Sequence, residues 1–223
     1  MPDVPVVPSG RAGKKTGPAA ELIGPYRYVH GPLGQRITTD TLLLSEFVLP
    51  LKQDDSVIDL GTGAGVLPLI FAARSGCGSI KGGDVMDGAA KTAQQNVVSN
   101  GLDSRIVILK MDLRKLPEVY PEGSFSVVVS NPPYVKVGAG RISPVKERAV
   151  ARSEQLCSLF EIISVSKYLA GKSGRICFVF PTRRLEEMLC VLGSAGLKPR
   201  RLRFIHTQKD RPARRFLIEA GIS

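Results

Sequence analysis

Short apolar runs alternate with helical stretches along most of this 223-residue chain. Strands separated by helices favour βαβ units, and therefore a doubly wound α/β fold with an open, mostly parallel sheet of seven strands and helices on both faces. The short TQKDRPA segment between the last two strands predicts an antiparallel C-terminal hairpin at one edge. The predicted strands are residues 56–61, 79–85, 105–112, 125–131, 175–181, 200–207 and 214–219, and the predicted helices are 66–74, 87–102, 153–174 and 182–196. Asp87, Ser153 and Thr182 are the expected N-caps.

The length and composition favour one globular domain after a short leader. Residues 1–23 are rich in Pro, Gly and Lys, which predicts a flexible basic leader, and 24–223 are then a single domain. No apolar run is long enough to span a membrane and no secretory signal is present, so we expect a cytoplasmic monomer. The four cysteines lack a C-x-x-C pair and the two histidines lack ligand partners at metal spacing. We therefore expect reduced core thiols and no metal site.

The charge balance points to a polyanionic partner. Lys and Arg number 31 against 20 Asp and Glu, which makes the formal net charge +11. Such an excess favours phosphate contacts, although a generically basic soluble protein would show it too. Basic residues crowd into KPRRLRF (198–204) and QKDRPARRF (208–216), so Arg200, Arg201 and Arg203 are candidate contacts to RNA.

A glycine-rich turn, DLGTGAG (59–65), follows the first of these strands. It lacks the dinucleotide fingerprint G-x-G-x-x-G, and without G-K-[ST] it is not a triphosphate loop. Asp59, Asp84 and Asp112 each end a strand, so in a parallel sheet they share one rim. A single such Asp is often only a turn or capping residue. Three together suit a ligand with an amine, a ribose diol and an exocyclic amino group.

The stretch VVVSNPPY (127–134) ends another strand at the same rim. Asn131 offers a neutral amide acceptor. Pro132 and Pro133 hold the backbone rigid and supply no competing N–H, while Tyr134 offers a flat face for stacking. This is the expected catalytic segment.

Together, VIDLGTGAG, Asp84, Asp112 and NPPY resemble the Rossmann-like class I methyltransferases that use S-adenosylmethionine to methylate an amino nitrogen. The longer stretch SNPPYVKVGAGRISPVKERAVARSE resembles the bacterial N6-adenine methyltransferases that modify the adenine beside the anticodon of valine tRNA, with one departure at Ser153, where that family often carries His. The segment QRITTDTLLLSEFV (35–48) resembles that family's entry segment, in which Asp40 and the following helix cap the cofactor.

The resemblance implies S-adenosylmethionine as cofactor, S-adenosylhomocysteine as product, no metal, and tRNA as substrate. Asn131 and the Pro132 carbonyl would each accept an N–H from the adenine amine, so catalysis rests on orientation and proximity. The implied cofactor contacts are Asp40, Asp59, Gly61, Thr62, Gly63, Gly65, Asp84, Val85, Asp112, Leu113 and Asn131, and further RNA contacts are Arg141, Arg148 and Arg152.

Other functions fit parts of the same pattern. NPPY also occurs in protein glutamine N-methyltransferases and in rRNA guanine-N2 enzymes, so a glutamine side chain or an rRNA amine is an alternative substrate. A catalytically silent RNA-binding module on the same fold is a further alternative, against which the intact Asn131, Tyr134 and glycine loop argue.

Overall fold

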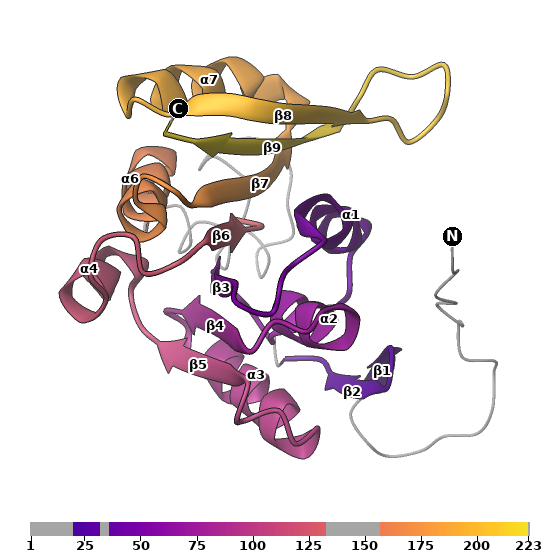
Figure 1. Cartoon of the computed structure of the whole chain (residues 1–223). Helices are drawn as coiled ribbons and strands as arrows, with labels where there is room; N and C mark the ends of the chain where they lie inside the picture. The colour runs from indigo at the N-terminus through magenta and orange to yellow at the C-terminus, as the bar shows by residue number, and fades with distance from the viewer. Residues whose placement is uncertain (1–19, 32–35, 133–156, 223) are drawn as a thin grey trace.

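The computed structural model describes residues 20–31, 36–132 and 157–222. Seven strands form one sheet in the order β5-β4-β3-β6-β7-β9-β8 (Figure 1). The strands are β3 (Ser56–Leu60), β4 (Ser79–Asp84), β5 (Ile106–Lys110), β6 (Val127–Ser130), β7 (Arg175–Pro181), β8 (Lys198–Ile205) and β9 (Arg215–Gly221). All neighbouring pairs from β5 to β7 are parallel, whereas β9 runs antiparallel to both β7 and β8. The predicted seven-stranded sheet with an antiparallel hairpin is confirmed.

Helices cover both faces of the sheet, as predicted. One core lies between the sheet and α1 (Thr39–Val48), α2 (Val66–Arg74) and α3 (Asp87–Ser99). The other lies under α4 (Leu116–Val119), α6 (Leu159–Ala170) and α7 (Leu185–Ser194). Because strand side chains alternate, Val57 of β3 enters the first core and Ile58 enters the second.

The helix starts differ from those expected. Asp87 is the first helical residue of α3, and its N-cap is Met86. Thr182 opens a 3₁₀ turn, η2 (Thr182–Arg184), and its hydroxyl donates to the Ala213 carbonyl at 2.7 Å instead of capping α7. Ser158 begins α6 through a capping box with Glu161, whereas the expected cap Ser153 lies outside the described residues.

A two-stranded hairpin that was not predicted precedes α1. β1 (Ala20–Ile23) and β2 (Tyr26–Val29) pair antiparallel, so residues 20–23 of the range assigned to the leader form a strand. Asn96 of α3 and Asn100, the C-cap residue of that helix, hold it, accepting from the Val29 and Arg27 amides at 2.9 and 2.8 Å.

Two of the four cysteines are buried in the core. Cys77 and Cys177 are core thiols, but Cys157 is half-buried and Cys190 is exposed, so the expectation of four core thiols was wrong. Within residues 20–31, 36–132 and 157–222, none of the helices has the length and apolar character needed to cross a membrane.

Gly82 of β4 allows the glycine-rich turn to pack closely against the sheet. A Cβ there would lie 2.8 Å from Thr62 Oγ1 and 3.0 Å from Ile108 Cδ1, whereas a Cβ at Gly83 meets no atom within 4 Å. We expect Gly82→Ala to lower the free energy of unfolding by roughly 1–3 kcal/mol through overpacking. Gly83→Ala is the matched control in chemical denaturation, and equal stability of the two variants would contradict this view of the loop.

Candidate active site

The pairing of β3 with β6 brings the two predicted motifs together. Asp59 lies opposite Val129 in the parallel register, so both strands end at the same edge of the sheet. The buried Ser130 hydroxyl donates to the Leu60 carbonyl at 2.6 Å and ties these ends to each other. Asn131, the next residue, therefore lies beside the glycine-rich turn.

The glycines of that turn are required by backbone geometry. Gly61, Gly63 and Gly65 have φ of 76°, 58° and 85°, in the region that side chains disfavour. The amides of Gly61 and Thr62 donate to the Gly83 carbonyl at 2.8 and 3.0 Å, which anchors the turn to β4. The chain then enters α2 directly.

A pocket of about 360 Å³ opens at this edge, within the size range of small-molecule sites. Three segments contribute to it: the chain entering α1, the glycine-rich turn with the start of α2, and the end of β6. The lining residues are Arg36, Thr38, Thr41, Asp59, Gly61, Thr62, Gly63, Ala64, Val66, Leu67 and Asn131.

Asp59 places a buried carboxylate in the pocket wall. The residue is only 2% exposed, and its Oδ1 has no hydrogen-bond partner among the described residues. Burial raises the pKa of Asp59 to about 7; the neighbouring Thr62 hydroxyl lowers it in part and the charge of Asp84 raises it further. A buried anion is costly unless it is paired, so the pocket fits a ligand with a cationic group, such as the ammonium of S-adenosylmethionine.

Asp84 braces the glycine-rich turn from the end of β4. Its Oδ2 accepts from the Gly63 amide at 2.9 Å and its Oδ1 from the Met86 amide at 2.8 Å. Burial raises the pKa of Asp84, and these two hydrogen bonds oppose that shift. Asp84 and the exposed Val85 lie at the expected edge but do not line the pocket.

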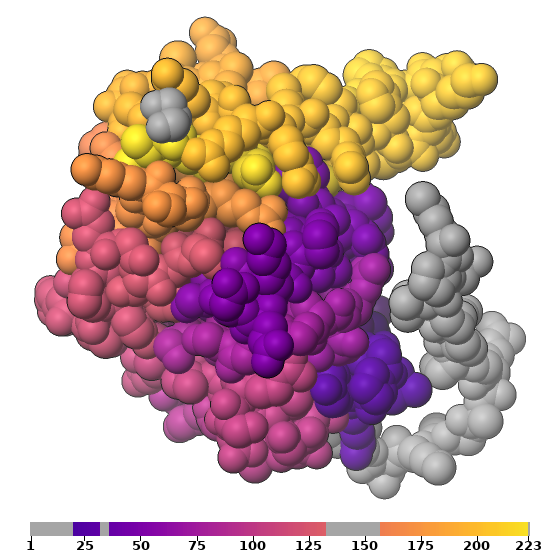
Figure 2. Space-filling view, in the orientation of Figure 1, coloured from indigo at the N-terminus to yellow at the C-terminus, as the bar shows by residue number. Residues whose placement is uncertain are grey.

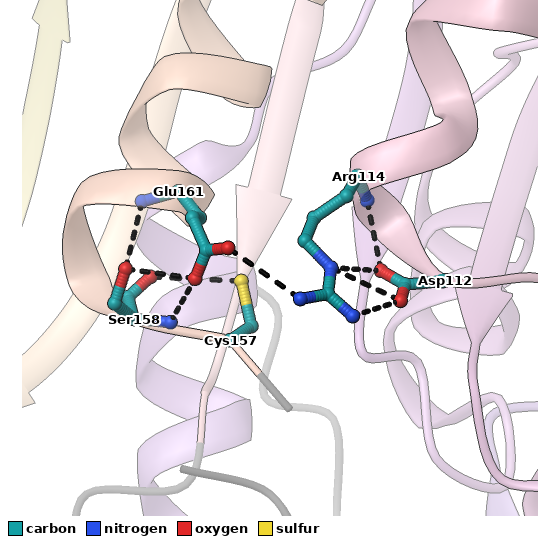
Figure 3. Close-up of polar contacts among 5 residues, drawn as sticks. All are labelled: Asp112, Arg114, Cys157, Ser158 and Glu161. Atoms are coloured by element: carbon teal, nitrogen blue, oxygen red, sulfur yellow. Dashed lines mark hydrogen bonds and ion pairs between the residues drawn. The ribbon is translucent and has the colours of Figure 1, made fainter. Parts of the chain in front are cut away.

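Asp112 is engaged by an arginine that the sequence analysis did not single out. Both carboxylate oxygens of Asp112 accept from Arg114 Nε at 3.0 Å, and the Arg114 guanidinium also lies 3.5 Å from Glu161 in the capping box of α6 (Figure 3). Hydrogen bonds from Arg114 hold the pKa of Asp112 below its ordinary value. Asp112 also caps the short η1 turn (Leu113–Lys115), and neither it nor Leu113 lines the pocket.

Asp40 lies in the first turn of α1, but other residues of that segment line the pocket. Its carboxylate accepts from Arg215 Nε of β9 at 2.8 Å. The pocket is lined instead by Arg36, Thr38 and Thr41, which the sequence analysis missed. The T-x-x-T spacing of Thr38 and Thr41 is typical of a helix N-cap, and it could have predicted that these two residues lie together at the start of α1.

Asn131 is held by the cap of α1. Its Nδ2 donates to Thr41 Oγ1 at 3.0 Å, and Thr41 Oγ1 lies 2.9 Å from Oγ1 of Thr38, the N-cap residue. Because the amide nitrogen is directed at Thr41, the amide oxygen takes the opposite side of the side chain. Pro132, the next residue, is buried. Pro133, Tyr134, Arg141, Arg148 and Arg152 lie outside the described residues.

The arginines of β8 make contacts within the protein. Arg201 stacks on the Phe47 ring, with its guanidinium carbon 4.2 Å from the ring centroid, and lies 3.5 Å from the buried Glu219. Arg200 donates to the Ile222 carbonyl. Arg203 extends over the same Phe47 ring at 5.6 Å. Replacing all three would therefore disturb packing as well as surface charge.

The buried carboxylate of Asp59 predicts a pH-dependent penalty to folding. Its folded pKa lies above that of an unfolded aspartate, so the penalty is absent below about pH 4 and grows as pH rises through about 7. We expect Asp59→Asn to raise the free energy of unfolding by about 2–4 kcal/mol at pH 8, and by less at pH 5. Urea denaturation at both pH values measures this, and a pH-independent difference would contradict the assignment.

Several sequence relatives of this chain share one name. The tRNA1(Val) (adenine(37)-N6)-methyltransferase of Aeromonas hydrophila is 25% identical over 193 residues, covering 86% of this chain and 79% of that protein. The protein of the same name from Photobacterium profundum is 27% identical over 192 residues, covering 85% and 78%. These relatives confirm the resemblance seen in the sequence.

The fold is shared with solved methyltransferases. A predicted O-methyltransferase from Agrobacterium tumefaciens superposes with a TM-score of 0.62 at 20% identity, covering 82% of this chain and 80% of that one. Geranyl diphosphate C-methyltransferase from Streptomyces coelicolor, solved with S-adenosyl-L-homocysteine, superposes with a TM-score of 0.61 at 13% identity, covering 82% and 78%. The family model described as "Methyltransferase small domain" matches residues 36–158, more than half of the chain. The chain therefore belongs to the methyltransferase small domain family.

Proposed function

We propose that this protein transfers a methyl group from S-adenosylmethionine to the exocyclic N6 amine of an adenine in tRNA, beside the anticodon of a valine tRNA. The observation that carries the proposal is the position of Asn131: it ends β6 next to the glycine-rich turn, and its amide nitrogen is held by Thr41. The names of the relatives support the choice of substrate.

The adenine amine is a poor nucleophile because its lone pair is delocalised into the ring. In our proposal, Asn131 Oδ1 and the Pro132 carbonyl each accept one of its N–H bonds, which turns the lone pair out of conjugation. When bound, S-adenosylmethionine supplies an electrophilic methyl group on its sulfonium. The N–C bond forms as the C–S bond breaks, and the surplus amine proton leaves to solvent. The rate enhancement then comes from holding the amine and the methyl group close together in the right orientation.

Four other predicted residues keep their roles in the proposal. Asp84, braced by two backbone amides, is the candidate acceptor for the ribose hydroxyls, by the logic of dinucleotide sites. The Asp112 carboxylate keeps lone pairs that Arg114 does not use. These can accept a hydrogen bond from the amino group of the cofactor's adenine. Pro133 and Tyr134 would stiffen the segment and stack the target base.

The structure favours a different set of RNA contacts from the one expected on β8. The hairpin between β8 and β9 projects from the body of the protein (Figures 1 and 2). Lys209, Arg211 and Arg214 are exposed on it, and no described carboxylate forms an ion pair with them. The turn itself is held by hydrogen bonds, including His206 Nδ1 with the Arg211 carbonyl at 2.8 Å.

This hairpin lies at the same edge of the sheet as the pocket. Arg215, where β9 begins, pairs with Pro181 at the carboxyl end of β7, which runs parallel to β6. Arg215 also binds Asp40, two residues from the capping Thr38. A phosphate backbone that crosses the hairpin would therefore run along the edge of the sheet at which Asn131 lies, which supports a nucleic-acid substrate.

The substrate is tested directly by incubating the protein with labelled S-adenosylmethionine and total tRNA that lacks this modification. We expect mass spectrometry to identify N6-methyladenosine in valine tRNA. Methyl transfer to a protein glutamine or to rRNA, with none to tRNA, would refute the proposal.

Asn131→Ala should fold and bind cofactor but lose most of its turnover, because one of two amine acceptors is gone. Thr41→Val, which removes the acceptor for the Asn131 amide N–H, should slow transfer less because Asn131 itself remains. Single-turnover methyl transfer at saturating tRNA and cofactor measures both variants. Transfer by Asn131→Ala at the parent rate would show that the residue does not orient the amine.

Replacing Lys209, Arg211 and Arg214 together with Gln should weaken tRNA binding and reduce its dependence on salt. Each lost phosphate contact removes about 0.7–0.9 from the slope of log K against log salt. The matched control replaces Lys52, Lys172 and Lys198, which are exposed at the opposite edge of the sheet. Equal losses in the two triple variants would mean that net charge, and not the hairpin, governs binding.

A further inference from the structure

Two large apolar side chains lie exposed on β8, the strand at one edge of the sheet (Figure 1). Leu202 is 43% exposed and Phe204 is 46% exposed. They pair with Ile218 and Phe216 of β9, which are buried in the core under α6 and α7. Directly paired side chains share one face of a sheet, so this apolar surface continues from the core to the open edge.

Positive charge gathers next to Phe204. The hairpin segment 206–214 carries Lys209, Arg211 and Arg214 against one carboxylate, Asp210. Arg183 of η2 adds a further exposed cation, and Thr182 beside it donates to the Ala213 carbonyl at the base of the hairpin. No described carboxylate forms an ion pair with Arg183. The exposed ring therefore lies where an anionic partner is favoured.

Strand register places Phe204 level with the chain that leaves β6. Phe204 pairs with Phe216, which pairs with Phe180 of β7. Ser130, at the end of β6, pairs with Phe178, only two residues before Phe180. Three strand spacings separate β6 from β8, which amounts to about 14 Å. Nucleotides of a stacked strand are about 3.4 Å apart, so about four of them span this separation.

We propose that Phe204 is a stacking platform for an unpaired base of the substrate RNA, in the same single-stranded stretch as the target adenine. The inference rests on the proposed function. An aromatic face that stacks a base, with cations nearby to bind phosphates, is the pattern of sites for single-stranded RNA. A target base that leaves the stack to reach Asn131 also leaves other bases of its loop without a stacking partner, which the ring can replace.

Pairing of two copies of the chain through β8 fits this edge less well. It would bring Lys198, Arg200 and Arg203 of one copy close to the same residues of the other. Such charges on an edge strand oppose edge-to-edge association. An RNA partner has the opposite charge and gains from the same residues.

Binding of an unmodified valine tRNA transcript tests the platform. Phe204→Ala should weaken binding about 5- to 100-fold and leave the slope of log K against log salt unchanged, because stacking releases no counterions. Phe204→Leu keeps an apolar side chain opposite Phe216 but has no ring, so it should lose nearly as much affinity. Phe204→Tyr should bind like the parent. Val98→Ala, which removes an exposed apolar side chain near the end of α3, is the control and should not alter the affinity.

The chain contains no tryptophan, so stacking can be observed directly. Phe204→Trp introduces a single indole, and a base stacked on it should quench its fluorescence when tRNA binds. Val98→Trp is the matched control and should keep its fluorescence.

Parent affinity in both Phe204→Ala and Phe204→Leu, or equal quenching in the two tryptophan variants, would overturn the role of Phe204. A dimeric parent that becomes monomeric in Phe204→Ala, measured by analytical ultracentrifugation, would instead make this edge an interface between two copies. If the parent protein transferred no methyl group to tRNA, the proposed function itself would fail, whereas an active parent without these effects would overturn the platform alone.

Discussion

The parallel pairing of β3 with β6 is the constraint on which the rest of the site depends. These strands are distant in sequence, yet their register places Asp59 opposite Val129 and leaves the glycine-rich turn and Asn131 as neighbours. The hydrogen bond from Ser130 to the Leu60 carbonyl closes the junction. A shift of one residue would turn the alternating side chains to the opposite face and separate the two motifs.

The pocket keeps a charge that folding alone would disfavour. Asp59 is buried without a described partner for Oδ1, and burial raises its pKa to about 7. Such perturbed groups gather at functional sites because a ligand, and not the fold, completes their interactions. Asp84 shows the contrast, since two backbone amides already stabilise its carboxylate.

Some basic residues of this protein stabilise the fold, and others lie exposed on its surface. The net charge counts both kinds together. Arg105 donates to the Ser75 and Cys77 carbonyls at 3.0 and 2.8 Å, and Arg201 pairs with Glu219 and stacks on a ring. Both arginines stabilise the fold. Lys209 and Arg211 extend on a hairpin, and neither forms such a contact with another residue that the structure describes. The formal charge of +11 therefore includes arginines that already stabilise the fold, whereas the exposed basic residues of the hairpin lie at the same edge of the sheet as the pocket.

By itself the sequence determined the seven-stranded α/β sheet, the family resemblance and the order of the seven strands along the chain, because these depend on local periodicity and short motifs. The sequence also showed that the turn after Asp59 needs glycine, because the backbone conformation of a tight turn depends on the residues of the turn itself. Tertiary structure decided which side chains face the pocket: Thr38 and Thr41 line it, whereas the carboxylates of Asp40 and Asp112 are taken by arginines close to them in space. Arg114 lies only two residues from Asp112, but the pairing of Asp40 with Arg215 depends on how α1 packs against β9, which brings together groups 175 residues apart in the sequence.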